Sequence, residues 1–247
     1  MTTALITNDD GIDSPGLHSL ARMAIEAGLD VVIAGPSEQS SGSSASILGA
    51  NADGRVPYSR RELEGFDIPV FAVDAAPALI SLIAAHGAFG FVPDLVFSGV
   101  NRGANVGHAI LHSGTVGAAL TAGVNGARGL AVSLDVGMDP DACLWDAAAP
   151  HVSHLVPLLL EQPAGTVFNL NVPNVETKTE LREGPLAAFG IVQTLTAVGG
   201  DDDVRLEVSD TPADQEEGTD AALLRAGHAT VTNITGVREA SVAVLAN

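Results

Sequence analysis

Short apolar runs alternate with segments of helical periodicity along residues 1–135 of the chain. Runs rich in β-branched and aliphatic residues, typical of strands buried on both faces, lie at 3–7, 30–36, 69–73, 94–100 and 129–134. Apolar positions spaced as in helices lie between them, at about 15–27, 76–87 and 114–125. This alternation predicts an α/β fold with a doubly wound, mostly parallel, Rossmann-like sheet.

The pattern loosens after residue 135. A helix is expected over about 144–161 and a buried strand over 166–173, and short strands with turns follow. We expect residues 1–135 to form the core that carries the functional site. Residues 136–247 are expected to complete the sheet as a smaller, irregular, β-rich C-terminal part of the same globular unit, and to form the contacts between subunits.

Acidic side chains dominate the charge of the chain. It has 30 Asp and Glu against 11 Lys and Arg, a formal net charge of −19, which is too little positive charge to bind a nucleic-acid duplex. Nine of the acidic residues lie within 201–220, which predicts a solvated excursion there. An anionic substrate would be repelled at long range unless the site itself supplies a metal ion or helix N-termini.

Cysteine content and hydropathy bear on the location of the protein. Cys143 is the one cysteine, so an intramolecular disulfide and a cysteine-based zinc site are excluded, and a reducing compartment fits. The chain has neither a run of about 18 apolar residues nor a basic segment ahead of an apolar leader. We therefore expect a soluble cytoplasmic protein that does not bind membranes.

Ligands of open α/β sheets bind beyond the carboxyl ends of the strands, so the loops at those ends are the places to examine. The loop Asn8–Gly11 follows the first strand with two adjacent aspartates, which favour a hard cation such as Mg²⁺ or Mn²⁺, although a polar Asx turn is an alternative. The loop Ser40–Ser44 follows the second strand. Its small residues allow close approach to a phosphate or a metal, or they form a flexible linker.

A third loop is longer and richer in glycine. It runs from Ser98 to Gly107, and His112-Ser113-Gly114-Thr115 follows at the start of a predicted helix. Asparagines, glycines and a helix N-terminus together form a neutral, donor-rich pocket for an oxyanion. His108 lies in the same stretch, where its position is consistent with either a structural role or a contact with substrate.

Several common types of site are disfavoured because their motifs do not occur. No G-x-G-x-x-G follows the first strand, and no G-x-x-x-x-G-K-[ST] exists because the one lysine is Lys178. Neither a G-x-S-x-G nucleophile elbow nor an H-E-x-x-H zinc motif is present. Dinucleotide binding by the usual fingerprint, P-loop nucleotide binding and α/β-hydrolase chemistry are therefore not expected.

Three motifs occur together in this chain. They are T-N-D-D-G-I-D-S-P-G at 7–16, A-G-P-S-E-Q-S-S-G at 34–42, and S-G-V-N-R-G-A-N-V-G with H-S-G-T-V-G-A within 98–118. In combination they resemble the stationary-phase survival protein SurE family of metal-dependent 5′-nucleotidases. The likeness covers residues 1–135 well, and it continues more faintly at 169–173 and 219–232.

The resemblance implies a set of site residues. A divalent cation, Mg²⁺ or Mn²⁺, would be held by Asp9, Asp10, Ser41 and Asn101. The substrate phosphate would be bound by Asn8, Gly42, Asn105, Ser113, Gly114 and Thr115. Asp9, Asp10 and Asn101 would act in catalysis, with Asp10 the expected proton relay, and no serine or cysteine nucleophile is required.

One segment departs from the family pattern. Residues Ala75–Ile80 stand where the family carries a G-T-P-A-D-C-like stretch, and they keep only its proline and alanine, so recognition of the base or sugar is in question.

The leading hypothesis is a hydrolase that removes phosphate from nucleoside 5′-monophosphates. The alternatives are a broad-specificity phosphomonoesterase and a nucleotide-binding module without catalysis. The family's mode of assembly implies a homodimer or homotetramer.

Overall fold

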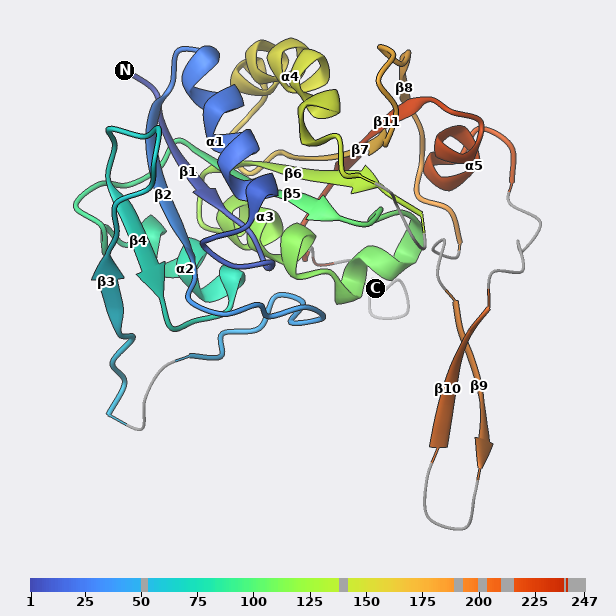
Figure 1. The fold of residues 1–247 in the computed structure, drawn as a ribbon, viewed down its shortest axis with the longest axis horizontal. Coiled ribbons are helices and arrows are strands. Elements are labelled where there is room, and N and C mark those ends of the chain that lie inside the picture. The colour runs from blue at the N-terminus through green and yellow to red at the C-terminus, as the bar shows by residue number, and fades with distance from the viewer. Residues whose placement is uncertain are drawn as a thin grey trace, which may run out of the picture.

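In the computed structural model, residues 1–49, 53–137, 142–188, 193–199, 204–209, 216–237 and 239 are described. They form a nine-stranded sheet in the order β3-β4-β2-β1-β5-β6-β7-β11-β8 (Figure 1). In that order the strands are Tyr58–Arg60, Val70–Val73, Asp30–Pro36, Thr3–Thr7, Leu95–Arg102, Arg128–Asp135, Val167–Pro173, Ala229–Ile234 and Leu181–Glu183. The six strands from β4 to β7 are parallel to one another, whereas β3 and β11 are antiparallel to their inner neighbours.

Helices cover both faces of this sheet (Figure 1). Helices α1 (Pro15–Glu26) and α4 (Ala149–Glu161) pack on one face, and α2 (Pro77–Ala85) and α3 (Gly114–Val124) pack on the other. Along β1, Ala4 and Ile6 belong to the first layer and Leu5 to the second, as the alternation of side chains in a strand requires. The predicted doubly wound α/β fold is therefore confirmed.

The boundaries follow local chemistry. Strands β1 and β2 have the predicted bounds, and α1 begins at Pro15, whose missing N–H is tolerated in the first turn. The helix expected over 144–161 is divided into a 3₁₀ turn, η2 (Trp145–Ala148), and α4. Pro150 lies in the first turn of α4, where a proline is tolerated, and Pro157 lies inside the same helix.

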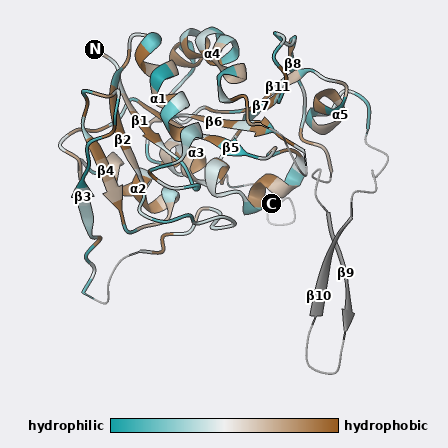
Figure 2. Cartoon of the chain, viewed as in Figure 1, coloured by the Kyte–Doolittle hydropathy of each residue, from teal (hydrophilic) through white to brown (hydrophobic). Residues whose placement is uncertain are grey.

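The two edge strands are short and polar. Strand β3 lies between the predicted strands 30–36 and 69–73, where the hydrophobic pattern predicts no strand. Its three residues are exposed. Figure 2 shows both β3 and β8 in the hydrophilic colours, in contrast to the hydrophobic strands at the centre of the sheet. Among the described residues, no helix combines the length and the hydrophobicity needed to cross a lipid bilayer.

Strands β9 (Gln193–Gly199) and β10 (Val204–Ser209) form a separate antiparallel hairpin that extends away from the sheet (Figure 1). Part of the acidic segment 201–220 therefore forms a strand, while 201–203 and 210–215 lie outside the described residues. Asp220 contradicts the expectation of a solvated segment. It opens the short helix α5 (Asp220–Arg225) with 0% exposure. Its carboxylate accepts hydrogen bonds from three backbone N–H groups, those of Gly107, Ala187 and Ala221, which offset the cost of burying it.

Candidate functional site

The loops after β1, β2 and β5 meet at one point of the carboxyl edge of the sheet. Asp10, in the first loop, accepts a hydrogen bond from the backbone N–H of Arg102 at the end of β5 (3.4 Å). Its other carboxylate oxygen lies 3.5 Å from Nε2 of Gln39, in the second loop. Strands β2, β1 and β5 are neighbours in the sheet, so residues about 90 positions apart in the sequence contribute to one site.

Asp9 is buried, with 6% exposure. Thr115, in the first turn of α3, donates its hydroxyl to Oδ1 of Asp9 at 2.6 Å. Burial raises the pKa of Asp9 above its usual value, and hydrogen bonds from the Thr115 hydroxyl and backbone oppose that effect without cancelling it. Thr115, predicted to bind phosphate, thus directs its proton to Asp9 in this structure.

The neighbouring carboxylate of Asp10 experiences two unfavourable effects. Its pKa is raised first by burial and second by the negative charge of Asp9, and only the backbone and charge of Arg102 act in the opposite direction. Two partly dehydrated carboxylates side by side repel each other, and a cation held between them would favour the ionised form of both. The electrostatics of the pair therefore favour a bound metal ion.

Ser41 and Asn101 carry neutral oxygens on the other two loops of the site. Gln39 Nε2 donates to Ser41 Oγ (2.8 Å), and Asn101 Nδ2 donates to the carbonyl of Gly103 (2.6 Å), so the amide oxygen of Asn101 remains available to a ligand. No group of three or more His, Cys, Asp or Glu with metal-binding geometry occurs in the described parts of the chain. Two carboxylates with hydroxyl and amide oxygens suit a hard divalent cation rather than zinc.

Buried polar atoms without a protein partner surround the same point. Within the described residues, Asn8 Oδ1, Ser40 Oγ and Ser43 Oγ are buried and make no hydrogen bond. Such atoms are rare in folded proteins, because each one costs about 1–3 kcal/mol of desolvation. Their concentration around Asp9 is the fit expected of a site that a cation and a polar ligand complete.

The N-terminus of α3 forms one wall of the site. Ser113 caps the helix by accepting a hydrogen bond from the N–H of Val116 (3.1 Å), which leaves its hydroxyl proton free to be donated. A Cβ atom at Gly114 would lie 2.7 Å from both Asp9 Oδ2 and Ser43 Oγ. Only glycine fits there, which explains the Ser-Gly-Thr sequence at this helix end.

The other predicted phosphate ligands differ in their surroundings. Asn8 is fully buried and donates from Nδ2 to the carbonyl of Gly11 (3.0 Å). Gly42 is exposed, with the positive φ of 72° that glycine accommodates readily. Asn105 is instead drawn toward the sheet, because its Nδ2 donates to Ser133 Oγ (2.9 Å).

Three residues that anchor Asn105 were not identified from the sequence. Asn171 Oδ1 accepts from the N–H of Asn105 (2.7 Å), and the side-chain amides of Asn169 and Asn171 both donate to its carbonyl (2.8 Å each). Together with Ser133, these polar side chains lie on β6 and β7, and Asn169, Asn171 and Ser133 are fully buried. Their signal in the sequence is the polar residue at every second position of an otherwise apolar strand, as in N-L-N.

A cavity of about 490 Å³ opens beside the loops that follow β1, β2 and β5, which we call the metal loops. We call this cavity the β2–β4 cavity. It is lined by the ends of those two strands and the loops that follow, namely Pro36, Ser37, Glu38, Gln39, Ser40, Ser43, Leu48, Gly49, Val73, Asp74, Ala75 and Ala76. Three of these residues, Gln39, Ser40 and Ser43, also take part in the site around Asp9 and Asp10. The cavity and the metal loops are therefore continuous.

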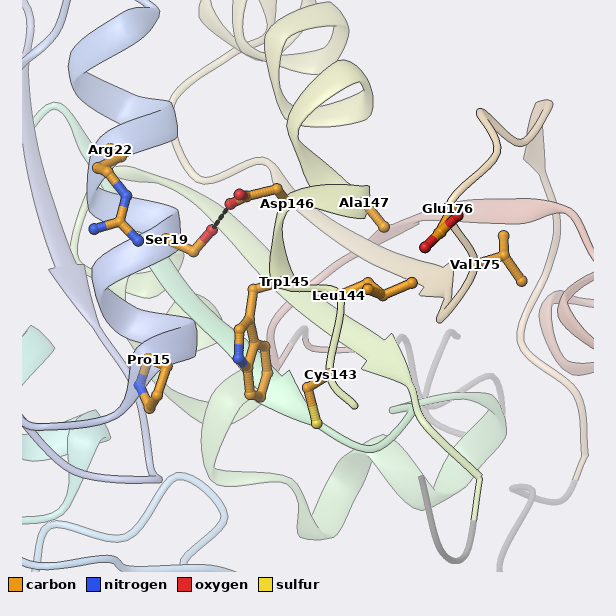
Figure 3. A pocket seen from close by; sticks show the side chains of 10 residues that line it. All are labelled: Pro15, Ser19, Arg22, Cys143, Leu144, Trp145, Asp146, Ala147, Val175 and Glu176. Atoms are coloured by element: carbon orange, nitrogen blue, oxygen red, sulfur yellow. Dashed lines mark hydrogen bonds between the residues drawn. The ribbon is translucent and has the colours of Figure 1, made fainter. Parts of the chain in front are cut away.

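A second cavity, of about 470 Å³, lies between α1 and η2, and we call it the α1 cavity (Figure 3). Trp145 faces α1 there, and Ser19 donates a 2.5 Å hydrogen bond to Asp146 across the gap. Trp145 packs against Gly16, which itself lies against the carbonyl of Val100. None of the predicted metal or phosphate ligands lines this cavity.

Comparisons with known proteins show the family of the chain. The chain matches the family model described as survival protein SurE over residues 4–191. Proteins named 5′-nucleotidase SurE from Symbiobacterium thermophilum and Natranaerobius thermophilus are 40% and 33% identical over 70% of this chain, and the matches span 66% and 67% of their own lengths. The crystal structure of the SurE protein from Aquifex aeolicus is 25% identical with a TM-score of 0.70, covering 94% of this chain and 93% of that one. The chain therefore belongs to the SurE family.

Proposed function

We propose that this protein is a divalent-metal-dependent hydrolase that removes phosphate from nucleoside 5′-monophosphates. The observation that carries the proposal is the pair Asp9 and Asp10, partly dehydrated and adjacent, at the N-terminus of a long helix and among buried polar atoms without partners. The relatives bearing the name 5′-nucleotidase SurE support the same reaction.

The proposed metal ligands are Asp9, Asp10, Ser41 and Asn101, which belong to the three loops at this edge of the sheet. When bound there, Mg²⁺ or Mn²⁺ would polarise a phosphoryl oxygen, lower the pKa of water and offset the negative charge of the transition state. Thr115 fixes the orientation of Asp9 through its 2.6 Å hydrogen bond. This arrangement resolves the conflict between a net charge of −19 and an anionic substrate, because the two carboxylates nearest the phosphate are compensated locally.

The chain's own groups account for the remaining steps. The N-terminal N–H groups and dipole of α3 favour a phosphate at this end of the helix, with Asn8 and the free hydroxyl proton of Ser113 as further donors. Asp10, less buried than Asp9, is positioned to accept the proton of the attacking water. Nδ2 of Asn101 donates one proton to the carbonyl of Gly103, and its second proton would stabilise an equatorial oxygen of the phosphate.

Phosphate release from a nucleoside 5′-monophosphate with Mn²⁺ tests the proposal. Asp9→Asn and Asp10→Asn should each lower kcat by about 10²–10⁴, since each removes a metal ligand and, at Asp10, the proton acceptor. Asp13→Asn is the matched control, because Asp13 belongs to the same loop but is exposed and pairs with Arg61 (3.6 Å). Wild-type turnover in both site variants, or full activity after exhaustive chelation, would contradict the proposal.

A panel of substrates distinguishes the alternatives. Comparable kcat/KM for nucleoside monophosphates and simple sugar phosphates would identify a broad-specificity phosphomonoesterase. Calorimetric binding of a nucleoside monophosphate without phosphate release would identify a binding module. The proposal also includes a cytoplasmic location. It further includes a homodimer or homotetramer, and sedimentation of the purified protein at several concentrations would test this oligomeric state.

A further inference from the structure

The β2–β4 cavity is built from backbone contacts and is therefore preformed. Ser37 N donates to the carbonyl of Val73 (2.8 Å), and Ala76 N donates to the carbonyl of Leu48 (3.0 Å). A Cβ atom at Gly49 would lie 2.4 Å from Cα of Ala75, so the second loop packs directly on the end of β4. The walls are thus fixed by main-chain geometry.

The cavity has the size of a small-molecule site and adjoins the place proposed for the phosphate. Its volume of about 490 Å³ lies within the range of roughly 300–1,000 Å³ that is typical of ligand pockets. Ser40, which lines it, donates its backbone N–H to the carbonyl of Asp9 (2.8 Å). A phosphate ester bound at Asp9 and Asp10 therefore has room for its organic half on this side.

The chemistry of the lining is selective. Glu38 and Asp74 are exposed carboxylates at its rim, and Leu48, Ala75 and Ala76 form an apolar wall. Among the described residues, no lysine, arginine or histidine lines the cavity. Carboxylates accept hydrogen bonds from hydroxyl and amino groups and repel further anions. The two alanines belong to the segment 75–80 that departs from the family pattern, so this wall is a property of this chain.

The α1 cavity is a poorer candidate for the same role. It contains Arg22 and the aromatic ring of Trp145, but none of its lining residues belongs to the three loops that surround Asp9 and Asp10 (Figure 3). The two cavities differ little in volume. Continuity with the metal loops, rather than size, separates them.

We propose that the β2–β4 cavity holds the sugar and base of the substrate, and that Glu38 and Asp74 select neutral, hydroxyl- or amine-bearing organic halves over those carrying a second phosphate. This inference rests on the proposed phosphohydrolase function. Adenosine 3′,5′-bisphosphate is disfavoured, because whichever phosphate reaches Asp9 and Asp10, the other is carried into the acidic cavity.

Filling each cavity from an exposed residue tests the location. Ser37→Trp should raise KM for adenosine 5′-monophosphate about tenfold or more, while kcat/KM for phenyl phosphate, which is too small to need the cavity, changes little. Val175→Trp is the matched control in the α1 cavity, since Val175 is 39% exposed and lines that cavity only. If Val175→Trp raises KM for the nucleotide and Ser37→Trp does not, the proposed location is wrong.

Charge reversal tests the selectivity. The wild-type protein should prefer adenosine 5′-monophosphate to the 3′,5′-bisphosphate, and Asp74→Lys and Glu38→Lys should each reduce that preference by about threefold to tenfold at low salt. An unchanged ratio in both variants would overturn the role of the carboxylates. A wild-type protein that releases phosphate from neither nucleotide nor phenyl phosphate would instead refute the underlying phosphohydrolase proposal, so the two failures are distinguishable.

Discussion

Two buried aspartates in this molecule have opposite surroundings. Asp220 accepts three hydrogen bonds from backbone N–H groups at 2.8 Å, contributed by η1 (Gly107–His112), the loop at Ala187 and its own helix α5. Asp9 has the Thr115 hydroxyl at Oδ1, and its Oδ2 faces Gly114 and a serine hydroxyl that has no partner among the described residues. A carboxylate satisfied by the main chain holds elements together, whereas one left incomplete is suited to bind a ligand.

The largest expected effect is on the structural side of this comparison. Asp220→Ala leaves three buried N–H groups without an acceptor and should lower the free energy of unfolding by about 3 kcal/mol or more. Asp220→Asn, which keeps one acceptor oxygen, should lose less. Urea denaturation measures both, and kcat per folded molecule should stay near the wild-type value. A loss of activity without a loss of stability would mean that Asp220 is not primarily structural.

The next effect concerns Thr115, whose hydroxyl orients Asp9. Thr115→Val removes the donated hydroxyl while nearly preserving volume, and it should reduce metal affinity and kcat by about tenfold, as is usual for residues that position a metal ligand. Thr115→Ser keeps the hydroxyl and should restore most of both. Calorimetric titration with Mn²⁺ provides a readout besides activity. Equal losses in the valine and serine variants would assign Thr115 to packing instead.

The same substitution should have opposite signs at the two aspartates. Without metal, Asp9→Asn removes a poorly solvated charge and should leave stability unchanged or raise it by about 1 kcal/mol, whereas Asp220→Asn destabilises. Thermal unfolding in chelator at pH 7 compares the two variants directly. Destabilisation of the Asp9 variant equal to that of the Asp220 variant would remove the distinction between a structural and a functional carboxylate.

The smallest effect concerns a buried group remote from the site. Burial, followed by the charges of Lys178 and His154, lowers the pKa of His151 below its ordinary 6.5. The unfolded chain therefore takes up a proton first as the pH falls, and the stability contributed above pH 6.5 is lost between 6.5 and the lowered pKa. His151→Gln should flatten the dependence of Tm on pH between 7 and 5. An unchanged slope would mean that His151 does not contribute to the acid sensitivity of the fold.

Much of the fold could be predicted because hydrophobic periodicity decides it. The parallel core follows from apolar runs that form strands buried on both faces. Helices α2 and α3 follow from apolar positions spaced as in helices. The division at Pro150 and the exposed strand β3 could not be predicted from periodicity, since a single proline and three polar residues carry little periodic signal.

The predicted site residues lie on loops that the structure brings together, but the hydrogen bonds between them could not be predicted. Asp9, Asp10, Ser41 and Asn101 lie on three loops whose meeting follows from parallel strand order. The hydroxyl of Thr115 bonding to Asp9 and the side chain of Asn105 bonding to Ser133 depend on side-chain direction, which spacing does not specify. Asp220 was misjudged for the same reason, because its neighbours in sequence are acidic while its neighbours in space are backbone N–H groups.

The short edge strands limit how copies of this chain can associate. Strands β3 and β8 are each only three residues long, and they place Arg60 at one border of the sheet and Arg182 and Glu183 at the other. A border that is brief and charged is a poor template for the backbone of another molecule, which is how many natural sheets avoid fibre-like growth. Crowding in a concentrated solution should therefore not join these sheets edge to edge. A homodimer or homotetramer would instead form through helices, loops or the β9–β10 hairpin.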